Sequence, residues 1–170
     1  DLAMAVRQPA GVVLGMAPWN APIILAVRAI ATPLACGNTV ILKGSELSPA
    51  TQGLIIESLA AAGFPQGVVN YLTSAPQDAP KLVETLIAHP GVRRINFTGS
   101  TPVGRIIAQT CAKHLKPVVL ELGGKAPLLV LDDADIEQAA AGSTVYSCIE
   151  CFLQMHEVSG SCSSDQGHGT

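Results

Sequence analysis

Four short segments of the sequence combine polar residues with glycines or prolines in ways that suit binding or catalysis. The first, PWNAP at residues 18–22, holds an aromatic residue and Asn20 between two prolines. Such a rigid setting suits an amide N–H that donates a hydrogen bond to a developing oxyanion. The alternative is a turn that uses asparagine and proline only for its shape, and the motif taken alone favours it.

The second segment, KGSE at residues 43–46, follows an apolar run and places a lysine and an acid three positions apart. Lys43 and Glu46 together suit the hydroxyl groups of a ribose. A solvated loop that precedes a helix is the other interpretation. This motif alone supports the two about equally.

The third segment, FTGSTPVG, covers residues 97–104. Gly99 permits close backbone approach, and the helix that follows would offer free N–H groups and its positive dipole end to a phosphate. Ser100 adds a hydroxyl donor. A Gly-Ser turn in which Ser100 or Thr101 caps the helix is the simpler interpretation, and the motif alone favours it. The sequence contains no GxGxxG, so this is not an ordinary dinucleotide-binding fingerprint.

The fourth segment is ELGGKAPLLVLDDAD, residues 121–135. It sets Glu121 against Gly123, Gly124 and Lys125, and then continues into six residues without charge. The local sequence leaves both a structural and a chemical role open for this acid. Its position relative to the other segments therefore matters.

Apolar runs rich in branched residues alternate with segments of helical period, and these elements must position the four segments. The predicted strands cover residues 11–16, 39–43, 67–72, 93–97 and 116–122. The predicted helices, three with proline in the first turn, cover residues 22–35, 49–62, 78–89 and 102–114. This alternation predicts an α/β fold class, an open parallel sheet flanked by helices and built with right-handed crossovers.

Each of the four segments lies at the end of a predicted strand or directly after it. In open parallel sheets, ligands bind beyond the carboxyl ends of the strands. We therefore expect the four segments to meet at one edge of the sheet. The set as a whole favours a ligand site, although two of its motifs taken singly favour a plain turn.

Composition excludes several classes of protein. With 170 residues, 48% hydrophobic and 14% charged, the chain is expected to form one globular piece. A net charge of −3 without any Lys/Arg cluster argues against nucleic-acid binding. Arg28 and Pro33 interrupt the most apolar stretch, so no membrane span is expected. The odd count of five cysteines, with Cys36 and Cys111 in apolar or helical surroundings, favours reduced thiols.

Residues 7–141 resemble a known family almost without a gap. RQPAGVV, PWNAP, PLACGNTVILKGSELSP, GFPQGVVNYL, INFTGSTPVG and ELGGKAPLLVLDDADIEQAA follow one another as in the cofactor-binding domain of the NAD(P)-dependent aldehyde dehydrogenase superfamily. Several long motifs in one order are far more specific than any single pattern. Within the family, APIIL, ACGNTVILK and SELSPAT are most similar to enzymes of the salicylaldehyde and vanillin dehydrogenase kind.

The resemblance implies two catalytic residues. Asn20 matches the side chain that stabilises the oxyanion of a thiohemiacetal, and Glu121 matches the general base that activates water to hydrolyse a thioester. The implied mechanism has a cysteine thiolate add to the aldehyde, a hydride leave to NAD, and water release the acid. If Glu121 is buried among apolar strands, we expect its pKa to be raised toward the working range of a base.

The resemblance also implies a cofactor site. Lys43 and Glu46 match the pair that holds the adenosine ribose, where an acid near the 2′-hydroxyl favours NAD over NADP. Ser100 matches the residue that contacts the pyrophosphate. Trp19 matches a position beside the cofactor. Gly99 and Gly104 match residues that give the pyrophosphate room, and Leu122 and Gly123 match residues that line the nicotinamide side. No metal is expected.

The end of the chain departs from the family. The usual spacing puts the nucleophile at the position of Met155, in a Gly-Gln-x-Cys motif that is absent here. Residues 1–141 are therefore predicted to form a partial cofactor-binding domain, lacking most of the substrate-binding part. Residues 142–170 are predicted to form a divergent, irregular tail. A changed reading frame or an unspliced intron is the favoured explanation of the tail.

The tail offers two weaker alternatives. Cys148 and Cys151 form a CxxC with His156 and His168 downstream, so a zinc site can be imagined. The spacing matches no well-marked zinc finger, and a second CxxC is lacking. Cys151 as a displaced nucleophile is equally poorly supported.

Three hypotheses remain at this point: an aldehyde dehydrogenase represented incompletely, a non-catalytic NAD-binding module, and an inactive fragment. NAD-dependent aldehyde oxidation would single out the first, and saturable NAD binding without oxidation the second. Aggregation through exposed apolar surface would favour the third. We expect the 170 residues on their own to be inactive. The complete enzyme is expected to be a cytoplasmic homo-oligomer that acts on a small aldehyde and binds neither nucleic acid nor membrane.

Overall fold

Residues 2–124 and 129–142 are described by a computed structural model, and they belong to two compact units, residues 1–124 and 125–170. Within the described part of the second unit, residues 136–142 are helical. Asp135 begins this helix, because its Oδ1 accepts a hydrogen bond from the N–H of Gln138 at 3.0 Å. The first unit contains the first three of the four segments described above and residues 121–124 of the fourth.

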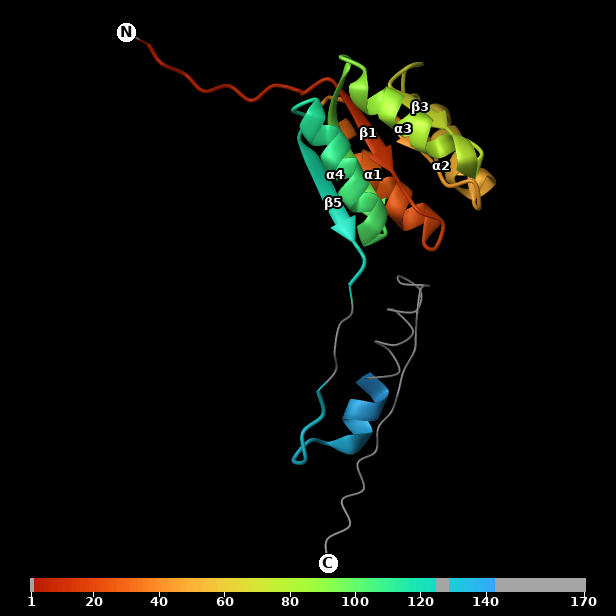
Figure 1. Cartoon of the computed structure of the whole chain (residues 1–170), viewed down its shortest axis with the longest axis vertical. Helices are drawn as coiled ribbons and strands as arrows, with labels where there is room; N and C mark the ends of the chain where they lie inside the picture. Colours follow the sequence, from red (N-terminus) through yellow and green to blue (C-terminus); the bar gives the residue numbers. More distant parts are fainter. Residues whose placement is uncertain (1, 125–128, 143–170) are drawn as a thin grey trace, which may run out of the picture. The chain divides into compact units, whose positions relative to one another are not determined.

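The first unit is built on a five-stranded sheet of order β3-β2-β1-β4-β5 in which every neighbouring pair is parallel (Figure 1). The strands are β1 (Val12–Met16), β2 (Thr39–Lys43), β3 (Val69–Leu72), β4 (Val92–Gly99) and β5 (Val118–Leu122). The central strand β1 therefore has a partner on each side, whereas β3 and β5 form the two edges.

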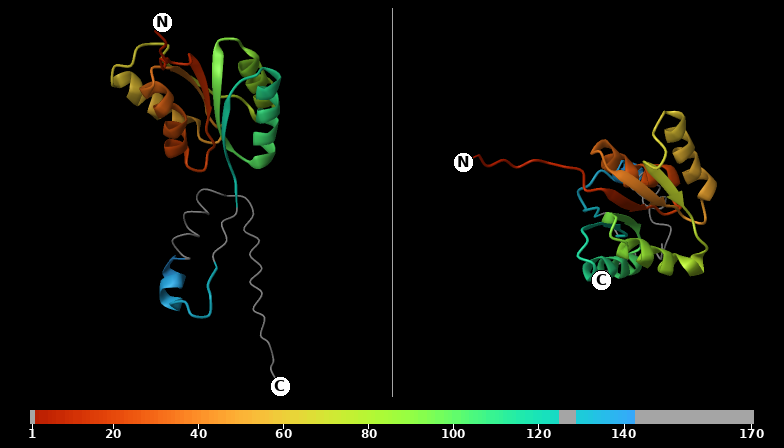
Figure 2. Two further views of the ribbon diagram at one scale, coloured as in Figure 1. Left: turned by 90° about the vertical axis from the view of Figure 1, so that its left-hand side faces the viewer. Right: turned by 90° about the horizontal axis from the view of Figure 1, so that it is seen from above.

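Helices cover both faces of the sheet, as Figure 2 shows. On one face α1 and α2 pack, and on the other α3 and α4. Their bounds are α1 (Pro22–Ala35), α2 (Pro49–Ala61), α3 (Ala79–Ala88), which the short 3₁₀ helix η1 (Pro76–Asp78) precedes, and α4 (Thr101–Lys113). The predicted α/β class, an open parallel sheet flanked by helices, is confirmed.

The core forms two apolar layers, one on each face of the sheet. Val13 of β1 faces the layer of α1 and α2, and the next residue, Leu14, faces the layer of α3 and α4. Successive strand side chains point to opposite faces, so a strand covered on both sides must be apolar throughout. This accounts for the uninterrupted apolar run VVLGM of β1.

Most predicted element ends agree with the structure, and the differences have local causes. The strand predicted from residue 116 begins at Val118, because Pro117 has no N–H to give to the ladder. The strand predicted from residue 67 begins at Val69, because Gly67 has a positive φ of 86° and belongs to the preceding turn. Asp78, predicted to start a helix, ends η1 instead.

The two described cysteines, Cys36 and Cys111, are free thiols, as expected. Cys36 is exposed, contrary to its apolar sequence surroundings, because it follows the last turn of α1. Cys111 lies in the core between α4 and the sheet. Burial raises the pKa of the Cys111 thiol, which keeps it protonated and unreactive. Among residues 2–124 and 129–142, no helix is both long and apolar enough to cross a bilayer.

Leu14 offers a test of the central strand, because its side chain is fully buried. Leu14→Ala is expected to lower the free energy of unfolding by about 2–5 kcal/mol, because it removes buried methyl groups and leaves a cavity. Urea unfolding of the 170-residue chain measures the loss. Leu54→Ala, which truncates an exposed leucine of α2, is the matched control. Equal losses in the two variants would contradict the placement of β1 at the centre of the core.

Candidate active site

The four segments, the fourth of them up to residue 124, lie at the carboxyl end of the sheet, because they end or follow β1, β2, β4 and β5 and these strands all run the same way. Met16, the last residue of β1, lies opposite Lys43 of β2 and Phe97 of β4. Beside β4, Thr98 lies opposite Glu121 of β5. The order of the strands places β2 and β4 on opposite sides of β1, so the loops after β1 and β4 diverge there. In open α/β sheets such a point of divergence forms a ligand crevice.

Lys43 and Glu46 lie together after β2. The Lys43 Nζ is 4.0 Å from Glu46 Oε2, and only 13% of the lysine side chain is exposed. The acid is 33% exposed. A loop that is merely solvated would not enclose the lysine in this way, so the structure favours an organised pair of groups.

A buried glutamine that the sequence analysis missed organises this edge. Gln52 of α2 is fully buried, and its Oε1 accepts a hydrogen bond from the N–H of Ser45 at 2.8 Å. Its Nε2 donates to the carbonyl oxygen of Pro18 at 3.1 Å and to that of Ala17 at 3.5 Å. One side-chain amide therefore joins the loop after β1 to the loop after β2.

The start of α4 has the form expected of a phosphate site. Ser100 occupies the N-cap position in extended conformation, but its side chain makes no capping hydrogen bond. Ser100 is therefore the N-cap residue, as the simpler interpretation predicted, but its hydroxyl does not bond to the helix. The Thr101 hydroxyl reaches the carbonyl oxygen of Gly123 at 3.5 Å. Because the helix begins at Thr101 and Pro102 has no N–H, the N–H groups of Thr101 and Val103 are the first-turn donors without an intrahelical acceptor.

Two glycines at this helix are required by close approach. A Cβ at Gly99 would lie 2.5 Å from Cζ of Phe97. A Cβ at Gly104 would collide with the side chain of Leu122 at the end of β5. Gly104 thus allows the first turn of α4 to lie close to β5, and the missing Cβ of Gly99 makes room for the ring of Phe97. The close packing of α4 on β5 suits a dinucleotide whose pyrophosphate approaches the start of the helix.

Glu121 is not buried, contrary to expectation. Its side chain is 47% exposed, and both of its carboxylate oxygens accept hydrogen bonds from Arg28 Nη1 at 2.8 Å. The Thr98 hydroxyl donates to Oε2 at 3.3 Å. The exposure follows from the position of β5 at the edge of the sheet, where no further strand covers it. The burial that we expected for Glu121 is therefore absent in this chain.

The remaining predicted residues lie at the same edge. Trp19 and Asn20 are half-buried in the loop between β1 and α1, and Leu122 and Gly123 are exposed at the end of β5. The structure thus places Lys43 next to Glu46, and Gly104 next to Leu122. It keeps the Lys43–Glu46 pair two strands away from Glu121, since β1 and β4 lie between β2 and β5.

No group of three or more His, Cys, Asp or Glu side chains able to hold a metal ion occurs within the described part of the chain. The zinc alternative involves Cys148, Cys151, His156 and His168, and these lie outside the described residues. The position of Met155 lies outside them as well.

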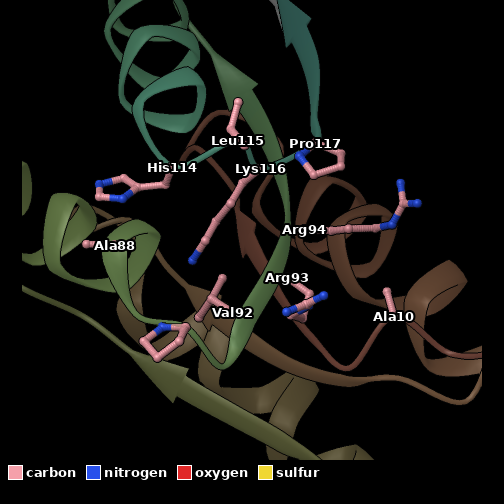
Figure 3. Close-up of a pocket in the computed structure, with 10 residues that line it drawn as sticks. Ala10, Ala88, Val92, Arg93, Arg94, His114, Leu115, Lys116 and Pro117 are labelled. Atoms are coloured by element: carbon pink, nitrogen blue, oxygen red, sulfur yellow. The ribbon is translucent and has the colours of Figure 1, made fainter.

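A hollow of about 460 Å³ lies at the amino end of the sheet, where the strands begin (Figure 3). Its lining includes Arg93, Lys116 and His114. Lys116 Nζ donates to the carbonyl oxygen of His89 at 2.6 Å, which joins the start of β5 to the loop before β4. The pKa of Lys116 is lowered mainly by burial, with Arg93 contributing in the same direction. This hollow is separate from the four segments.

Comparison with known proteins assigns the fold to a family. The profile described as "Aldehyde dehydrogenase family" matches residues 1–150. The chain belongs to the aldehyde dehydrogenase family. The resemblance identified from the motifs is therefore confirmed.

The relatives of this aldehyde dehydrogenase chain include enzymes named for aromatic aldehydes. It is 71% identical over 139 residues to vanillin dehydrogenase from Pseudomonas sp. (strain HR199 / DSM 7063), which covers 82% of the chain and 29% of that protein. The crystal structure of salicylaldehyde dehydrogenase from Pseudomonas putida G7, complexed with salicylaldehyde, superimposes with a TM-score of 0.82 at 56% identity. It covers 84% of this chain and 29% of that one.

A third relative is a cofactor complex. The crystal structure of PnpE in complex with nicotinamide adenine dinucleotide has a TM-score of 0.76 and 38% identity, covering 85% of this chain and 29% of that one. The aldehyde dehydrogenase chain therefore spans less than a third of the length of each relative.

Replacing Gln52 tests the link between the two loops. Gln52→Leu is expected to lower the free energy of unfolding by about 1–3 kcal/mol, because it leaves the Ser45 N–H without a buried partner. Urea unfolding measures this loss. Gln109→Leu, at an exposed position of α4, serves as the matched control and should change stability by less than about 0.5 kcal/mol. An unchanged Gln52→Leu protein would show that the amide does not hold the loops.

Proposed function

We propose that the chain is the cofactor-binding part of an enzyme that oxidises an aromatic aldehyde to the carboxylic acid with NAD. The observation that carries the proposal is the gathering of the matched residues at the carboxyl edge of the sheet, on both sides of β1. The names of the vanillin and salicylaldehyde dehydrogenases support the aromatic substrate. Because the chain spans 29% of their length, the activity belongs to a longer protein.

The adenosine half of the cofactor would lie after β2. Lys43 and Glu46 sit 4.0 Å apart there, and both can hydrogen-bond to ribose hydroxyls. The Glu46 carboxylate would repel the 2′-phosphate of NADP, which supports NAD as the cofactor. Trp19 lies in the neighbouring loop, which Gln52 ties to the loop of the pair.

The pyrophosphate would lie at the start of α4. Ser100, with a hydroxyl that caps no helix, and the free N–H groups of the first turn supply the donors. Gly99 makes room for the ring of Phe97 just before the helix, and Gly104 allows the helix to pack close to β5. The nicotinamide would then lie beside Leu122 and Gly123, at the end of that strand.

The reacting groups follow from this placement. When bound, NAD supplies the acceptor for the hydride of the aldehyde. Asn20 would donate its amide N–H to the oxyanion that forms when a cysteine thiolate adds to the carbonyl carbon. Glu121 would take a proton from the water that hydrolyses the thioester. We propose that the nucleophilic cysteine is supplied by the complete enzyme.

We also propose that the complete enzyme is a homo-oligomer of the cytoplasm that binds neither nucleic acid nor membrane. Free thiols at Cys36 and Cys111 suit a reducing compartment. Ile23 and Ile24 of α1 are 56% and 67% exposed, which supports covering of this helix by a further domain or subunit. The net charge of −3 disfavours a polyanionic partner.

The general base is tested in a hybrid enzyme, in which the 139 residues of this chain that match the 71% identical vanillin dehydrogenase replace the corresponding segment of that protein. Glu121→Gln is expected to reduce kcat by at least about 100-fold, because the amide cannot take a proton from water. Steady-state formation of NADH from vanillin measures the effect. Glu84→Gln, at an exposed position of α3, is the matched control. A Glu121→Gln enzyme with full turnover would refute the proposed mechanism.

Cofactor preference is tested at Glu46. Glu46→Gln is expected to shift the ratio of kcat/KM for NAD over NADP by about tenfold toward NADP, since it removes the charge that opposes the 2′-phosphate. The hybrid enzyme is assayed with each cofactor. The exposed Glu57 of α2 provides the control variant Glu57→Gln. If Glu46→Gln leaves the ratio unchanged, the adenosine ribose does not lie at this pair.

A further inference from the structure

The contact between Arg28 and Glu121 joins two elements that are 93 residues apart in sequence. One nitrogen of Arg28, Nη1, donates to both carboxylate oxygens at 2.8 Å, and the Thr98 hydroxyl donates to Oε2 at 3.3 Å. Arg28 lies in the middle of α1, Thr98 near the end of β4 and Glu121 near the end of β5. Donors from two different elements therefore fix the carboxylate of a third.

The ion pair between Arg28 and Glu121 is not expected to stabilise the fold appreciably. The two side chains are 56% and 47% exposed, and exposed ion pairs contribute little to the free energy of folding. An arginine on a solvent-facing position of α1 also breaks the most apolar stretch of the sequence. We therefore expect Arg28 to affect the orientation of the Glu121 carboxylate rather than the stability of the fold.

We propose that Arg28 is a positioning residue for Glu121, which it holds in the orientation needed to take a proton from the hydrolytic water. This inference rests on the proposed function. A carboxylate offers about four lone-pair directions, of which Arg28 occupies two and Thr98 one. One direction is left for the water.

The step assigned to Glu121 is the release of the acid. The water oxygen bonds to the thioester carbonyl carbon while its proton passes to Glu121, and the C–S bond then breaks so that the cysteine leaves as thiolate. Hydride transfer precedes this step and does not need the base. Loss of Arg28 should therefore slow hydrolysis and spare hydride transfer.

The experiment compares Arg28→Gln, Glu121→Gln and the double variant in the hybrid enzyme by rapid mixing with vanillin and NAD. In Arg28→Gln we expect a burst of about one NADH per site, followed by a steady-state rate lowered about 10- to 100-fold. KM for NAD should not change. The double variant should be no slower than Glu121→Gln, because Arg28 acts only through this carboxylate. Arg94→Gln, at an exposed position near the start of β4, is the matched control.

Several results would overturn the inference. An Arg28→Gln enzyme with an unchanged steady-state rate, or one that loses burst and rate together, contradicts it. A further loss in the double variant relative to Glu121→Gln contradicts it as well. If Glu121→Gln itself keeps full turnover, the proposed function fails, and this outcome is separate from a failure of Arg28 alone.

A second measurement uses the 170-residue chain itself and does not depend on the hybrid. Nitrogen-15 NMR reports how fast the guanidinium group of Arg28 rotates. We expect slow rotation in the native chain and fast rotation in Glu121→Gln, with Arg94 unchanged as the internal control. Equal rotation of Arg28 in both proteins would show that the carboxylate does not hold it, and would overturn the inference.

Discussion

Parallel pairing of β1 with both β2 and β4 is the constraint on which the rest of the structure depends. It forces every connection to cross a face of the sheet, and these crossovers supply α1 to α4. It also turns the carboxyl ends of all five strands to one edge. Because the chain moves away from β1 in one direction through β2 and β3 and returns to the other side with β4, the loops separate at β1. The site is a consequence of this topology.

The same constraint determines which residues remain for chemistry. A strand covered on both faces is mostly apolar in its middle, so charged groups gather at the strand ends and in the loops that follow. Lys43 and Glu121 occupy such ends, and their side chains leave the sheet where the apolar layers stop. Ser100 and Asn20 lie just beyond the ends of their strands. The apolar core therefore lies along the middle of the strands, and the candidate site lies at their carboxyl ends.

Local signals predicted the elements, whereas distant partners escaped prediction. Pro22 and Pro49 marked the starts of α1 and α2 because proline suits the first turn of a helix, and the branched runs marked the strands. The exposure of Glu121 was predicted wrongly, since it depends on the place of β5 at the sheet edge, which the order of elements along the chain does not reveal. Gln52 was missed because the loop it holds lies 34 residues away.

The amide of Gln52 has a consequence for how the protein can evolve. Because one side chain holds the loops after β1 and β2, a substitution that moves one loop displaces the other. The loop that carries Asn20 and the loop that carries Glu46 are thereby inherited as a unit. Under the proposed function, a change in cofactor preference is expected to arise by exchange of single side chains at the tips of these loops, and insertions or deletions within them should be rare among descendants.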